Sequence, residues 1–183
     1  MAENFYNSIL ELEKRFKSIG VNRLLVKNLA PNDNIKNQIY LGKDFSISNI
    51  IPFGNITLNL LGRRSRPYAL IDFSWIDSIG IYKAPYTNIV LYEKYSEVRL
   101  SGFIRKCKNP PEIIKSRQEG RIMFFGISSN KKIYGYVTNP FDKIYQKLQA
   151  MKLQKNGIFF EFPIKDEEST IFNKIKIVQQ NQE

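Results

Sequence analysis

The chain has 183 residues and carries 28 lysines and arginines against 17 acidic residues, a formal net charge of +11. It contains no histidine and one cysteine, Cys107, which excludes Ser-His-Asp and Cys-His catalysis, histidine-ligated zinc, multi-cysteine metal centres and an intrachain disulfide. No apolar run approaches the roughly 18 residues of a membrane span. These counts predict a soluble, reduced, cytoplasmic domain with no membrane partner, whose positive field favours polyanions.

The order of sequence patterns predicts a mainly β fold flanked by two helices. Apolar spacings of three and four predict a helix over residues 4–19, and Asn139-Pro140 is typical of a second helix start. Apolar runs bounded by turn formers predict strands at residues 23–29, 38–41, 56–61, 69–76, 88–92, 96–104, 121–127, 132–138, 158–162 and 171–178. Residues 44–50 fit either a strand or a short helix, and residues 112–118 fit a short helix. Many short strands with two flanking helices indicate a mostly antiparallel barrel or sandwich.

The strand predicted at 96–104 carries the chemically most informative pattern. Its alternation places Glu97, Arg99 and Ser101 on one face, opposite an apolar face. Arginine can bond guanine O6 and N7 in a bidentate pair, and glutamate can accept from the cytosine amino group. A carboxylate is repelled by DNA phosphates. The presence of Glu97 on this face therefore favours a role in hydrogen bonding to base edges, or in orienting Arg99, over a phosphate contact. An ordinary surface ion pair explains the same pattern and stays an open alternative.

Two loops add polar and basic side chains. In residues 29–38, asparagine and glutamine side chains can pair with adenine, and Lys27 and Lys36 can neutralise phosphates. A plain Pro-Asn-Asp turn is the alternative reading of this loop. The second loop, residues 62–67, contains three arginines for phosphate contacts, which are Arg63, Arg64 and Arg66.

Two other functions remain as alternatives. A small metal-dependent nuclease would need convergent acids, for which Asp72, Asp77 and Glu97 are the candidates, although none has a lysine at the usual spacing. A barrel that binds RNA or single strands would stack bases on exposed aromatics, for which Tyr40, Tyr92 and Tyr95 are the candidates.

Several segments resemble a known family. Residues 26–33, read Val-Lys-Asn-Leu-Ala-Pro-Asn-Asp, then residues 38–41 and Pro52, resemble the opening of the plant "B-three" DNA-binding pseudobarrel. They look even more like the effector-binding N-terminal domain of the restriction enzyme EcoRII. Residues 27–52, 95–103 and 119–126 are also similar to the N-terminal part of longer restriction endonucleases, in which an MvaI/BcnI-type nuclease domain follows.

The resemblance implies a B-three-like DNA-binding pseudobarrel of about seven or more mostly antiparallel strands with flanking helices. Its two arms would grip the major groove of double-stranded DNA like a wrench. Carried over to this sequence, the first arm would use Lys27, Asn32, Asp33, Lys36, Asn37 and Gln38. The second arm would use Lys94, Glu97, Arg99, Ser101, Arg105 and Lys106.

The resulting expectation is one DNA-binding domain spanning residues 1–183, with no catalytic residues and no cofactor. Its parts would be the helix at 4–19, the pseudobarrel body with both arms at 21–138, a helix with closing strands at 139–178, and a tail at 179–183. It would be the effector-recognition domain of a prokaryotic type II restriction endonuclease. The partner nuclease domain, with its Mg²⁺, would lie outside this chain, and CCWGG is a candidate target.

Overall fold

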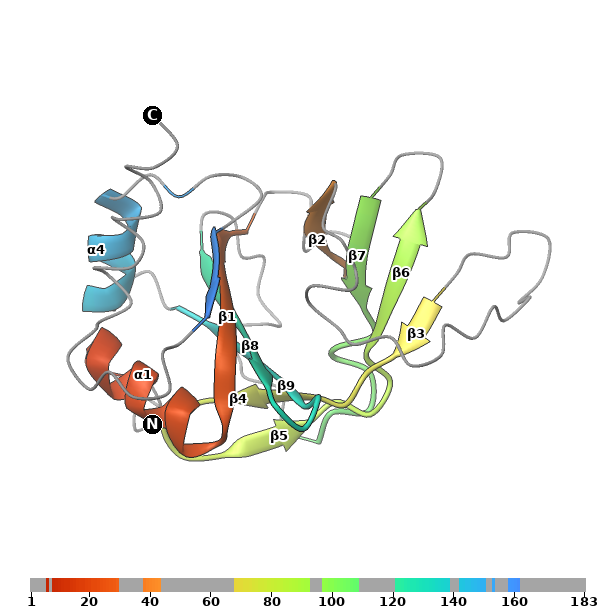
Figure 1. Cartoon of the computed structure of the whole chain (residues 1–183), viewed down its shortest axis with the longest axis horizontal. Coiled ribbons are helices and arrows are strands. Elements are labelled where there is room, and N and C mark those ends of the chain that lie inside the picture. Colours follow the sequence, from red (N-terminus) through yellow and green to blue (C-terminus); the bar gives the residue numbers. More distant parts are fainter. Residues whose placement is uncertain are drawn as a thin grey trace.

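The computed structural model describes residues 6, 8–29, 38–43, 68–92, 97–108, 121–138, 142–150, 153 and 158–161 (Figure 1). Within these ranges the chain forms two helices, α1 (Ile9–Ser18) and α4 (Lys143–Ala150), and ten strands. The strands are β1 (Val21–Asn28), β2 (Gln38–Lys43), β3 (Tyr68–Leu70), β4 (Phe73–Ile76), β5 (Ile81–Lys83), β6 (Asn88–Tyr92), β7 (Glu97–Ser101), β8 (Ile122–Ser128), β9 (Ile133–Val137) and β10 (Ile158–Glu161).

The strands form two sheets. The larger sheet has the order β10-β1-β8-β9-β4-β5, and the smaller sheet has the order β2-β7-β6-β3. Neighbouring strands are antiparallel, except that β4 pairs with β9 in parallel. The predicted fold class, a mainly β pseudobarrel with flanking helices, is therefore confirmed.

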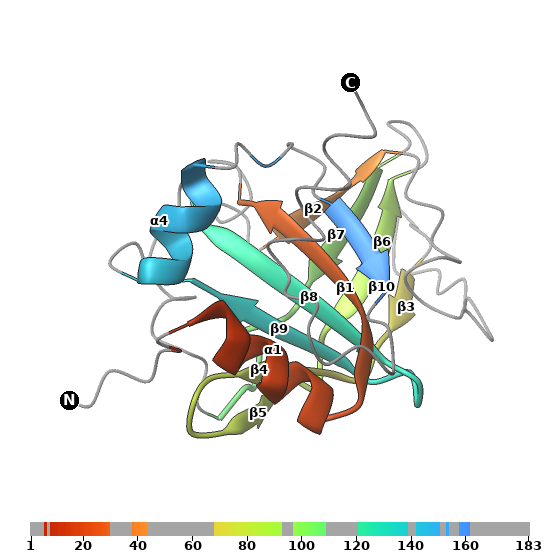
Figure 2. The same cartoon turned by 60° about the vertical axis from the view of Figure 1, so that its left-hand side comes forward.

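Two hydrophobic clusters cover the two faces of the larger sheet. The first cluster joins Phe124 and Tyr136 of the sheet to Leu12 and Phe16 of α1, and α4 adds Leu148. The second cluster fills the space between the two sheets and consists mainly of Leu25, Leu29, Ile39, Leu41, Phe73, Trp75, Ile89, Val98, Leu100, Phe103, Met123, Phe125, Ile133 and Val137. Figures 1 and 2 show the helices on one side of β1 and β8 and the smaller sheet on the other. The smaller sheet therefore packs through one face and presents its other face outward.

Both helices begin at a side-chain cap. The Ser8 hydroxyl accepts from the Glu11 amide at 3.2 Å, so α1 starts at Ile9 and is shorter than the predicted helix at 4–19. The Asp142 carboxylate accepts from the Ile144 amide at 2.9 Å at the start of α4. No helix in the described ranges is long and apolar enough to cross a membrane.

Two sequence predictions in the middle of the chain are corrected by the structure. Residues 69–76 were expected to form one strand, but β3 belongs to the smaller sheet and β4 to the larger one. The chain changes sheets at Ile71 and Asp72, where the Ile71 amide donates to Thr87 and the Asp72 carbonyl accepts from Ile133. The short edge strand β5 was not predicted. Predictions at 44–50, 56–61, 112–118 and 171–178, and the tail, lie outside the described residues.

Gly135 lets two aromatic rings pack directly on strand β9. A Cβ atom at this position would lie 2.6 Å from Phe73 Cζ and from Trp75 Cζ3. These rings are fully buried and hold each other in an edge-to-face contact with centroids 4.8 Å apart. Because both rings are enclosed by the core, an added Cβ atom would have to displace them.

We therefore expect Gly135→Ala to lower the free energy of unfolding by about 1–3 kcal/mol, because overpacking a filled core displaces its neighbours. Chemical denaturation measures the change. Gly80→Ala is the matched control, since its added Cβ would meet only the end of the half-buried Tyr82 side chain. Equal losses in the two variants would contradict this account of the core.

Candidate nucleic-acid interface

The outward face of the smaller sheet is built by strand alternation. On β7, Val98 and Leu100 are buried, whereas Arg99 and Ser101 are partly exposed. On β2, Ile39 is buried, and Gln38 is partly exposed. The alternation predicted for residues 97–101 is thus confirmed for Val98 through Ser101, and it places polar side chains of neighbouring strands on one surface.

Arg99 lies at the centre of this surface and is held from both neighbouring strands. Its Nη1 donates to Gln38 Oε1 at 3.1 Å, and its guanidinium carbon lies 4.6 Å from the centroid of the Tyr92 ring. Gln38 Nε2 in turn donates to the Tyr92 hydroxyl at 2.9 Å. The three side chains come from β2, β7 and β6, so the sheet register creates a network that orients a planar guanidinium before any ligand binds.

Ser101 and Glu97 occupy the two ends of β7. Ser101 stands opposite Gln38 on one side and Asn88 on the other, next to the Arg99 network. Glu97 stands opposite Lys43 and Tyr92 in the register. Its side chain lies outside the described atoms, so its role beside Arg99 stays a prediction.

The turn after β7 carries a second group of cations. Arg105 and Lys106 both lie over the ring of Tyr86, at 4.9 and 5.0 Å from its centroid, and Lys106 Nζ donates to the Tyr86 hydroxyl at 3.1 Å. The two cations and Tyr86 are exposed. Stacking on an aromatic face restrains both side chains while leaving them accessible. Sequence reasoning named the two cations but missed Tyr86, whose position in a loop before β6 gave no signal.

Close backbone packing fixes this turn. Gly102 has a φ of +73°, and a Cβ there would collide with the Tyr86 carbonyl oxygen. That oxygen accepts from Asn88 Nδ2 at 3.0 Å, and the Trp75 indole donates to the Phe103 carbonyl at 2.8 Å. The cations are therefore anchored to the core as well as to the sheet.

Lys27 was predicted to contact DNA phosphates, but its side chain is buried inside the protein. Its side chain is only 1% exposed, and its Nζ donates to the Tyr40 carbonyl and lies 5.4 Å from the Tyr40 ring centroid. The ladder between β2 and β7 changes register between Tyr40 and Gly42, so the buried ammonium supports an irregular part of the sheet. This position does not fit the phosphate contact expected of Lys27.

Eight predicted contact residues lie outside the described ranges, and these are Asn32, Asp33, Lys36, Asn37, Arg63, Arg64, Arg66 and Lys94.

The acids considered for a nuclease are not brought together. Asp72 and Asp77 flank the two ends of β4, and Glu97 belongs to the other sheet. Asp72 pairs with Lys83 at 3.5 Å, and the Asp77 carboxylate accepts from the amides of Ile79 and Gly80. No group of three acidic or cysteine side chains that could hold a metal ion occurs in the described ranges. The nuclease site proposed on these three acids is therefore not formed by this fold.

Comparisons with known proteins support the fold. Neither a protein family nor a curated protein matches the sequence. Among solved structures, the chain is similar to the N-terminal domain of Helicobacter pylori LlaJI.R1, with a TM-score of 0.51 and 15% sequence identity. The match covers 75% of this chain and 97% of that domain. At this identity the likeness concerns the fold alone.

Gly102→Ala should disrupt the turn that carries Arg105 and Lys106. We expect the free energy of unfolding to fall by about 1–3 kcal/mol, because the added Cβ meets backbone and the φ is unfavourable for alanine. Fluorescence of Trp75, the single tryptophan, reports the change directly, since its indole is bonded to this turn. Ser101→Ala, one residue earlier, is the control, and its expected effect stays within about 0.5 kcal/mol. A native Trp75 spectrum and unchanged stability in Gly102→Ala would refute the described packing.

Proposed function

We propose that this chain is a double-stranded DNA-binding domain that recognises a specific sequence in the major groove. The observation that carries the proposal is the Arg99 guanidinium, held by Gln38 and Tyr92 at the centre of an outward sheet face. The net charge of +11 and the similarity of the fold to another protein's N-terminal domain support it.

The chemistry of the surface suits base reading with phosphate anchoring. An oriented guanidinium can bond guanine O6 and N7 as a pair, and a glutamine amide can pair with adenine N6 and N7. Arg105 and Lys106, on the adjoining turn, are suited to phosphate oxygens, which position a protein on DNA without reading sequence. The surface therefore combines one oriented guanidinium, suited to hydrogen bonding with bases, and two accessible cations, suited to phosphate contacts.

The finer proposal rests on the sequence resemblance. We infer a B-three-like domain that serves as the effector-recognition part of a restriction endonuclease and cuts no DNA itself. The nuclease domain, with its Mg²⁺, would be a further domain of the same protein. The loops at 30–37 and 62–67 would complete the grip on the duplex, and CCWGG is the candidate site.

Selection from a randomised duplex library tests the proposal. Enrichment of one short sequence motif is the expected result, and single-stranded RNA should compete poorly. Preferential binding of single strands would favour the barrel that stacks bases on tyrosines. Incubation with Mg²⁺ should leave the duplex intact, and cleavage by the purified chain would overturn a role in binding alone.

Arg99→Ala should lose discrimination at one base pair of the selected site, worth about 1–3 kcal/mol, because the bidentate pair is removed. Binding to the site and to its single-base variants measures this loss. Arg105→Ala is the control, and it should weaken binding to all sequences about equally. If Arg99→Ala also weakened all sequences equally, Arg99 would be a phosphate contact, and its proposed role in reading bases would be lost.

A further inference from the structure

Two lysines occupy backbone conformations that disfavour them. Within the described ranges, the non-glycine residues with positive φ are Lys106, at 55°, and Lys131, at 66°. The left-handed region is unfavourable for a residue with a Cβ atom, and glycine or asparagine is the usual occupant. Both lysines are exposed, so core packing does not explain the choice of residue. An exposed charged side chain at a strained backbone position suggests a role for that charge.

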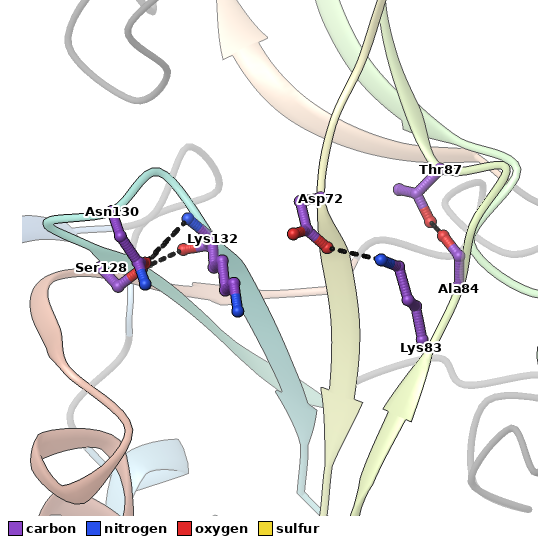
Figure 3. Close-up of polar contacts among 7 residues, drawn as sticks. All are labelled: Asp72, Lys83, Ala84, Thr87, Ser128, Asn130 and Lys132. Carbon is purple, nitrogen blue, oxygen red and sulfur yellow. Dashed lines mark hydrogen bonds and ion pairs between the residues drawn. The ribbon is translucent and has the colours of Figure 1, made fainter.

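Lys131 lies in the hairpin between β8 and β9, in which Ser128, Asn130 and Lys132 are hydrogen-bonded to one another (Figure 3). The Lys131 amide donates to the Ser128 carbonyl at 3.0 Å. The Ser128 hydroxyl accepts from the Lys132 amide at 3.1 Å and donates to the Lys132 carbonyl at 2.9 Å, and Asn130 Oδ1 is a second acceptor for the same hydroxyl. The hairpin backbone is therefore fixed, and it presents Lys131 and Lys132 to solvent side by side.

Asp72 links this hairpin to the turn that carries Tyr86. Its carbonyl accepts from Ile133 at 2.8 Å, and its carboxylate pairs with Lys83 of β5 at 3.5 Å. Directly after Lys83, residues 84–87 form the Tyr86 turn, which the Thr87 hydroxyl closes by donating to the Ala84 carbonyl at 2.8 Å. Figure 3 shows Asp72 and Lys83 between the hairpin and Thr87.

One end of the fold therefore collects exposed cations from three separate segments. The strand pairing places the β8–β9 hairpin and the C-terminal end of β5 at the same end of the larger sheet, with the start of β4 between them. The exposed cations there are Lys83, Lys131 and Lys132, joined through Tyr86 by Arg105 and Lys106. We call this set the basic edge. Asp72 lies within it and neutralises part of the charge of Lys83.

We propose that the basic edge, through Lys131 and Lys132 above all, binds phosphates of the DNA next to the bases read from the sheet. This inference rests on the proposed function. Phosphates fit better than bases because lysine is a compact charge on a flexible stem, without the planar fork that base edges match. The Arg105–Lys106 turn belongs to this edge and directly follows β7, the strand that carries Arg99.

Lys131→Gly separates this role from stability, because glycine adopts the same φ without strain. We expect its melting temperature to be no lower than that of the wild type. Its DNA affinity should fall by a similar factor for the selected site and for random duplex. The slope of log K against log salt should decrease in magnitude by about one, and Lys132→Ala should give the same change of slope. Lys143→Ala removes the same charge from the exposed start of α4, which Figures 1 and 2 both show away from the β8–β9 hairpin, and it should leave the slope unchanged.

The outcomes distinguish the two proposals. If the wild type binds duplex and Arg99→Ala loses discrimination, an unchanged slope in both lysine variants overturns the basic edge alone. A wild type that binds no duplex DNA overturns the proposed function and the basic edge together. An equal loss of slope in Lys143→Ala would mean that net charge, and not this edge, governs binding.

Discussion

The burial of both faces of the larger sheet at its central strands β8 and β9 limits where this protein can meet a ligand. Along β8, Phe124 packs toward the helices and Phe125 packs toward the smaller sheet, and every residue of the strand is buried. Such a sheet offers a partner only its edges and turns. Within the described residues, one face of the smaller sheet packs on the larger sheet, and Gln38, Arg99 and Ser101 on its other face are partly exposed. Of the surfaces that the structure describes, this face and the turns at the sheet ends are therefore the ones on which a binding site can form.

Local sequence patterns predicted much of this arrangement, because the core is built by alternation. The buried Val98 and Leu100 set the exposed side of β7, and the continuous apolar run of β8 was correctly expected to be a strand. The same alternation also predicts that the Lys27 side chain points into the protein, which was not recognised from the sequence. Lys27 shares the parity of Leu25 and Leu29, which both face the space between the sheets. The alternation of side chains along the strand thus places Lys27 inside the protein, whereas its positive charge suggested a position on the surface.

Other features depend on contacts that no local pattern contains. The apolar segment at 69–76 looks continuous in sequence, and only the pairing of β3 with β6 and of β4 with β9 shows that the chain changes sheets there. Likewise, the bond from Arg99 to Gln38 spans 61 residues and exists because β2 pairs beside β7. The hydrogen bond from Lys106 to the Tyr86 hydroxyl spans 20 residues and depends on the close approach of Gly102 to the Tyr86 backbone.

Cations on this surface are restrained in two different ways, which suits two different tasks. Arg99 is restrained through its side chain, by a ring and an amide, so the direction of its donors is set. Lys131 is restrained through its backbone, while its long side chain extends from a rigid turn. A guanidinium held in one orientation loses little conformational entropy when it pairs with a matching base. It binds a non-matching base more weakly, because its donors cannot turn to other acceptors. A flexible ammonium on a fixed turn can follow a phosphate oxygen on any sequence. Affinity and specificity would then reside in separate residues of one continuous surface.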